Sequence, residues 1–150
     1  MSLLEQINAD FKAAMLARDD FTKVTLNGLK SAIKNQEIAK GVREQGLSEQ
    51  EIQDVIAKEA KSRADAIALY QQAGDTERAD KESRERDILM QYLPKQLSTE
   101  EIKEIVLAII AEGGYSAADF GKVMGVAKSK IGNAAEGSVI ANVVKECLNK

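Results

Sequence analysis

Histidine is absent from this sequence of 150 residues, and its absence excludes several classes of catalytic site. Histidine is the commonest general base and a frequent zinc ligand, and its side chain ordinarily titrates near neutral pH. Ser-His-Asp triads, Cys-His pairs and histidine-containing zinc sites are therefore excluded. We expect no catalytic residue, no cofactor and no metal site.

Cysteine, proline and tryptophan are also scarce. Cys147 is the only cysteine, so an internal disulfide is impossible. It falls on an apolar helical stripe with no basic neighbour, which predicts a buried and unreactive thiol. One proline, no tryptophan and few alternating β-branched residues predict an all-α chain.

The sequence has no long apolar run and no large excess of either charge. No stretch approaches the length of a membrane span, and the N-terminus lacks a basic region followed by an apolar one. We therefore expect a cytoplasmic location and no membrane contact. The net charge is −3, so any binding to a polyanion must come from a local basic patch.

The sequence does contain clear signals for where helices begin and end. Capping boxes, in which a serine and a later acid satisfy each other's backbone amides, begin at Ser2, Ser48 and Ser98, with a weaker copy at Ser116. Glycines suited to a left-handed backbone follow several apolar stretches. These signals predict seven helices, at residues 2–18, 21–41, 48–73, 76–92, 99–112, 117–131 and 137–149.

Pro94, the single proline, predicts a boundary between domains. Proline cannot continue a helix and biases the preceding residue toward an extended backbone. We expect a four-helix N-terminal domain over residues 1–94 and a small three-helix domain over residues 95–150.

One candidate binding surface is the stretch GKVMGVAKSKIGNAA, residues 121–135, which holds three lysines and no acid. It is not a phosphate-binding P-loop, because its glycine spacing is wrong and its context is helical. On a helix, Lys122 lies opposite the apolar stripe, and Lys128 and Lys130 flank it. The lysines are either ordinary solvated side chains or a local positive surface for nucleic acid.

A second basic row comprises Lys23, Lys30 and Lys34, which share one narrow sector of the helix expected over residues 21–41. This row either binds a phosphate backbone or an acidic partner, or it only keeps the surface soluble.

Two further pairs of charged residues are candidates for a structural or catalytic role. Glu59 and Arg63 interrupt the apolar face of their helix, and their spacing of four predicts a partly buried ion pair with a structural role. Glu82 and Glu85 resemble paired catalytic carboxylates, but no neighbouring residue completes a site. We interpret their segment as a solvated helix that becomes buried from Ile88 onward.

Four stretches together resemble the YqeY, or GatB/YqeY-domain, family over essentially the whole chain: LNGLKSAIKNQEI, KEAKSRADAIALYQQAG, KESRERDILMQYLPKQLSTEEI and FGKVMGVAKSKIGNAAEGSVIANVVKECL. The last third is also similar to the C-terminal tail of GatB, a subunit of the glutamine-dependent amidotransferase that converts mischarged Glu-tRNA or Asp-tRNA. In that enzyme the tail is associated with gripping tRNA, while a separate domain performs the chemistry. That catalytic domain has no counterpart in these 150 residues.

The resemblance implies an all-helical, two-part, non-catalytic protein that contacts tRNA beside an amidotransferase, a carbon–nitrogen ligase with glutamine as amido donor. It assigns phosphate contacts to Lys122, Lys128 and Lys130, and the row of Lys23, Lys30 and Lys34 would extend them. One alternative is a protein–protein adaptor without nucleic-acid contact. Another is an enzyme with amide-transfer activity of its own.

Overall fold

The computed structural model describes residues 1–149, and over these residues the chain is all-α, as predicted. The described part holds seven α-helices and no strand. Their bounds are α1 Leu3–Leu16, α2 Asp20–Lys40, α3 Glu49–Gln72, α4 Thr76–Met90, α5 Thr99–Gly113, α6 Phe120–Ile131 and α7 Gly137–Leu148.

Capping boxes start three of these helices, α1, α3 and α5, as the sequence predicts. In each box the amide of the glutamate donates to the serine Oγ at 3.1–3.2 Å. The serine amide donates back to the glutamate carboxylate at 3.1–3.2 Å. Because these bonds join residues only three positions apart, the sequence alone is enough to locate them.

The end of α1 differs from the prediction, since the helix stops at Leu16 and not at residue 18. Arg18 adopts a left-handed backbone with φ 58°, a conformation that arginine rarely takes. Asp19 then caps α2, accepting a bond from the amide of Thr22 at 3.2 Å. No glycine marks this turn, so the sequence carries no signal for it.

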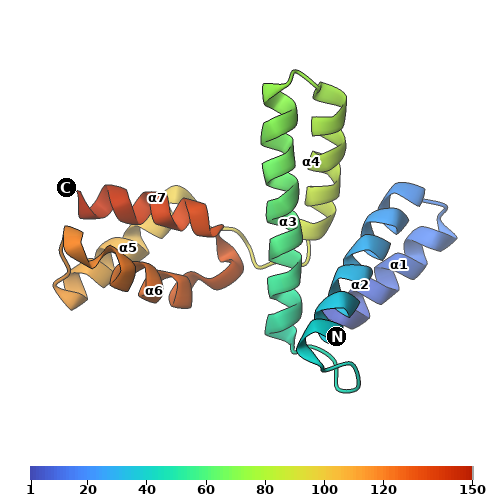
Figure 1. Cartoon of the computed structure of the whole chain (residues 1–150), viewed down its shortest axis with the longest axis horizontal. Coiled ribbons are helices and arrows are strands. Elements are labelled where there is room, and N and C mark those ends of the chain that lie inside the picture. The colour runs from blue at the N-terminus through green and yellow to red at the C-terminus, as the bar shows by residue number, and fades with distance from the viewer. Residues whose placement is uncertain (150) are drawn as a thin grey trace. The chain divides into compact units, whose positions relative to one another are not determined.

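The first compact unit spans Met1–Leu93. Within it α1 packs against α2, and α3 and α4 form a long antiparallel hairpin (Figure 1). One core joins both pairs of helices through buried side chains: Ile7, Leu26, Leu29, Ile33, Ile52, Ile56, Ala60, Leu89 and Tyr92.

The second compact unit begins at Pro94. Its three helices, α5, α6 and α7, all contact one another around a separate core. The thiol of Cys147 belongs to this core and is only 6% exposed, so the expected burial is confirmed. That each unit folds as a domain of its own stays a prediction.

Candidate nucleic-acid interface

The lysines of α6 lie on the exposed side of the second unit. The opposite side of the helix is anchored by Val123, Ala127 and Ile131, which are buried in the core. Lys122 is 74% exposed, and its Nζ lies 3.9 Å from Oδ1 of Asp119. Among residues 1–149 this loose contact is the only ion pair made by the three lysines, so their charges face solvent.

Lys128 and Lys130 do not converge on one point. The Cε of Lys128 lies 3.7 Å from where a Cβ would stand on Gly137, so this side chain reaches over the start of α7. Lys130 instead lines a hollow that it shares with Tyr115 and Glu112. The helix therefore offers separate positive points along a surface and not a single anion pocket.

The structure brings together two of the three lysines in the basic row predicted on α2. Lys30 and Lys34 line one hollow of about 350 Å³, together with Asn8 and Asn27. Lys30 also sits over the ring of Phe11, with its Nζ 4.5 Å from the ring centre. Lys23 lies outside this hollow.

Arg63 contacts carboxylates on two helices. Its Nη1 lies 3.0 Å from Oε2 of Glu59 on the same helix. Its Nε lies 3.3 Å from Oε2 of Glu85 on α4, and both of these side chains are less than one fifth exposed. The pair expected within α3 is thus part of a network that joins α3 to α4, and its structural role stays a prediction.

Glu82 interacts electrostatically with both Glu85 and Arg63 and so belongs to this network. Burial raises the pKa of the Glu82 carboxyl, and the neighbouring Glu85 carboxylate raises it further. The expectation that this helix is solvated up to Ile88 is wrong, because α4 packs along α3 and Ala79 is already buried at 4% exposure. The many charged residues of this segment gave no sign in the sequence that one face of α4 is buried.

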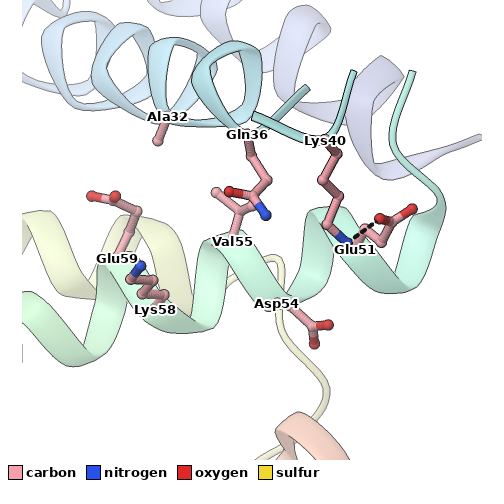
Figure 2. A pocket seen from close by; sticks show the side chains of 8 residues that line it. All are labelled: Ala32, Gln36, Lys40, Glu51, Asp54, Val55, Lys58 and Glu59. Carbon is pink, nitrogen blue, oxygen red and sulfur yellow. Dashed lines mark hydrogen bonds and ion pairs between the residues drawn. The ribbon is translucent and has the colours of Figure 1, made fainter. Parts of the chain in front are cut away.

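A separate hollow in the first unit, of about 220 Å³, lies between α2 and α3 (Figure 2). Gln36 from α2 and Val55 from α3 point toward one another across it. At one end Lys40 forms an ion pair with Glu51, which lowers the pKa of the Glu51 carboxyl to about 2, with help from the Ser48 amide. The hollow presents both charge signs, so it does not favour a polyanion.

Two other kinds of feature are absent from residues 1–149. No group of three or more cysteine or acidic side chains is placed to hold a metal ion. No α-helix of the described chain has the length and apolarity needed to cross a membrane.

Comparison with known proteins gives a match over nearly the whole chain. A family model described as Yqey-like protein matches residues 4–148. Among curated proteins, one of Clavispora lusitaniae is 35% identical over 105 residues, or 69% of this chain and 59% of the relative. One of Kluyveromyces lactis is 36% identical over 109 residues, or 71% and 57%. Both are named "Altered inheritance of mitochondria protein 41, mitochondrial".

These relatives correct one expectation from the sequence. They are named as mitochondrial proteins, which contradicts the predicted cytoplasmic location. Composition and the lack of a long apolar run were an insufficient basis for that prediction. The chain also spans less than two thirds of the length of these relatives.

Proposed function

The chain belongs to the Yqey-like protein family, and on that premise we propose that it is a non-catalytic helical protein that contacts the phosphate backbone of tRNA. The observation that carries this proposal is the set of exposed lysines on α6, a helix that contains no acidic residue: Lys122, Lys128 and Lys130. Exposed ammonium groups without strong partners are available to neutralise phosphates.

The hollow of Lys30 and Lys34 offers a second set of contacts in the first unit. Asn8 and Asn27 line it, and their side-chain amides make no hydrogen bond within residues 1–149. The Glu37 carboxylate also lines this hollow, but the two ammonium groups outnumber it. Amide and ammonium groups together suit the oxygens of a phosphate. Lys23 adds positive charge to the same helix.

The nature of these contacts defines what they can do. Lysines on phosphates fix the position of an RNA but do not read its sequence. Binding should therefore be modest and should weaken steeply with added salt. The resemblance of the last third of the sequence to the GatB tail would fit a role beside a tRNA-dependent amidotransferase, which would supply the carbon–nitrogen ligation.

The test is a titration of the purified protein with total tRNA at low and physiological salt, with duplex DNA as the competitor. A variant with Lys122→Glu, Lys128→Glu and Lys130→Glu should lose binding. A matched variant with Lys12→Glu, Lys58→Glu and Lys61→Glu changes the net charge equally on exposed side chains of the first unit, and it should retain most of the affinity. Equal losses in both variants would refute a specific role for α6.

The alternative of a protein adaptor is favoured by one observation. The hollow between α2 and α3 presents lysines and acids beside the apolar Ala32 and Val55 (Figure 2). Elsewhere on α2, Ile38 is 53% exposed. Such mixed surfaces suit a protein partner better than RNA. Co-purification separates the two functions, because nuclease-sensitive RNA supports the first and a defined protein partner supports the second.

A further inference from the structure

A small hollow lies beside Lys130 in the second unit and has a volume of about 200 Å³. Its walls come from α5, from the loop after it and from α6. They comprise Ile109, Glu112, Gly113, Tyr115, Val126 and Lys130. This volume is below the roughly 300–1,000 Å³ of sites for drug-sized ligands, so it suits a single planar ring system.

The ring of Tyr115 is held in a defined position by Gly113. A Cβ at residue 113 would stand 2.1 Å from Cε2 of Tyr115, so the ring fills the space that any other residue would occupy there. The Tyr115 amide donates to the carbonyl of Ile110 at 3.2 Å, which fixes the backbone. Its hydroxyl makes no hydrogen bond within residues 1–149, and the side chain is half-buried.

The groups around the hollow match the parts of one nucleotide. An aromatic ring and the aliphatic side chains of Ile109 and Val126 form walls for a flat base, and base–aromatic stacking tolerates any base. The Glu112 carboxylate can accept a bond from a base N–H group. The ammonium of Lys130 has no ion pair in the described chain and is placed for a phosphate.

Another aromatic hollow of this protein lacks that combination. The hollow near Phe21 also holds Arg84, whose guanidinium covers the Phe21 ring at 4.1 Å from its centre. A base cannot stack on a face that a cation already occupies.

We propose that the Tyr115 hollow binds one unpaired nucleobase of an RNA strand whose phosphate meets Lys130. The proposal rests on the proposed function in that the strand is taken to be the same tRNA. It adds a base-stacking contact that phosphate neutralisation alone does not provide.

The test uses adenosine monophosphate and ribose 5-phosphate, which share a phosphate but differ in the base. Binding is followed by NMR of tyrosine rings, of which the chain has three. Adenosine monophosphate should shift the Tyr115 ring signals and leave those of Tyr70 and Tyr92 in place. Ribose 5-phosphate should leave all three unchanged.

Variants then separate the ring from the charge. Tyr115→Leu should weaken binding of adenosine monophosphate about tenfold, within the range of a lost stacking contact, while Tyr115→Phe should retain it. Gly113→Ala, whose added methyl group would displace the Tyr115 ring, should also weaken binding while keeping the side chains of Ile109, Val126 and Lys130. Lys130→Gln should weaken binding severalfold, and Lys95→Gln, at an exposed lysine of the same unit outside the hollow, should leave it unchanged.

Failure of this inference is distinguishable from failure of the proposed function. Equal binding of the two probes, no binding of either, or binding untouched by Tyr115→Leu would overturn the Tyr115 hollow as a base site. If tRNA still binds in that case, the proposed phosphate contacts remain supported without a base-stacking contact. If tRNA does not bind but adenosine monophosphate shifts Tyr115, the base site stands and the tRNA function falls.

Discussion

Tyr92 ties together two parts of the first unit that are 82 positions apart in sequence. Its hydroxyl donates to Oδ2 of Asp10 on α1 at 2.5 Å, while its ring is buried beside the end of α4. Burial raises the pKa of the Tyr92 phenol, and the bond to Asp10 raises it further. The phenol therefore stays protonated and keeps donating over the ordinary range of pH.

Replacing Tyr92 by phenylalanine tests this contact. We expect Tyr92→Phe to lower the free energy of unfolding by about 1–2 kcal/mol, because a hydrogen bond to a charged group is removed. Tyr70→Phe is the control, since the Tyr70 hydroxyl makes no hydrogen bond in the described chain. Urea unfolding of both variants measures the difference, and equal losses would contradict the account.

The pH dependence of the Tyr92 contribution follows from its raised pKa. A group with a folded pKa above the unfolded value contributes its full stability below the unfolded pKa, about 10 for tyrosine. The advantage of the wild type over Tyr92→Phe should therefore persist up to about pH 10 and shrink above it. An advantage that vanished at neutral pH would show that another group controls it.

Arg18 offers a test in the opposite direction. The left-handed backbone at this position, with φ 58°, strains an arginine by roughly 1–2 kcal/mol, whereas a glycine adopts it without strain. Glycine loses more chain entropy on folding, so we expect Arg18→Gly to stabilise the protein by about 0.5–1 kcal/mol. Ala17→Gly, at an ordinary helical backbone, should destabilise it, and thermal unfolding of both variants decides the matter.

At the scale of helices, local signals could be read from the sequence and long-range contacts could not. The boxes at Ser2, Ser48 and Ser98 involve residues three positions apart, so they locate the starts of α1, α3 and α5. The partner of Arg63 on α4 and the buried face of that helix depend on which helices pack together. The spacing of residues within one helix does not show which other helix packs against it.

The candidate site shows the same division. Helical spacing places Lys122 opposite the apolar stripe and Lys128 and Lys130 on its flanks, and all three side chains are exposed. The spacing is informative because the lysines and the stripe lie on one helix. The Tyr115 hollow could not be anticipated, since its walls come from α5, α6 and the loop that joins them. One local signal was present in the pair Gly113 and Gly114, where the first glycine makes room for the tyrosine ring.

The network between α3 and α4 gives a prediction at this scale. Arg63→Leu removes the cation that faces Glu59, Glu82 and Glu85, so like charges remain half-buried together. We expect a loss of about 2 kcal/mol at neutral pH, since breaking one side of a partly buried pair leaves charges uncompensated. Lys61→Leu, on the exposed face of α3, should change stability by less than about 0.5 kcal/mol.

The pH dependence distinguishes charge from packing in this variant. Arg63 lowers the pKa of Glu82, which burial and Glu85 raise, so its removal raises that pKa further. A carboxyl whose pKa is higher in the folded than in the unfolded state stabilises the fold at a pH below its unfolded pKa. That stabilisation is lost as the pH rises through the folded pKa. The deficit of Arg63→Leu should therefore shrink in acid, and a deficit independent of pH would point to lost packing.

At the scale of the whole chain, the division at Pro94 leads to a prediction about folding. The two compact units have separate cores. We expect residues 1–93 and residues 94–150, made as separate polypeptides, each to be helical and to unfold cooperatively. Circular dichroism during urea unfolding measures this, and a unit without helix or without a cooperative transition would show that it depends on the other.

The most direct test of the tRNA proposal is the salt dependence of tRNA affinity. The logarithm of the association constant should fall linearly with the logarithm of salt concentration, and each lysine that contacts a phosphate should contribute about 0.7–0.9 to the slope. Lys122→Gln, Lys128→Gln and Lys130→Gln should each reduce the slope by that amount, while Lys61→Gln should not. A slope near zero, or one that the α6 variants leave unchanged, would contradict the proposal.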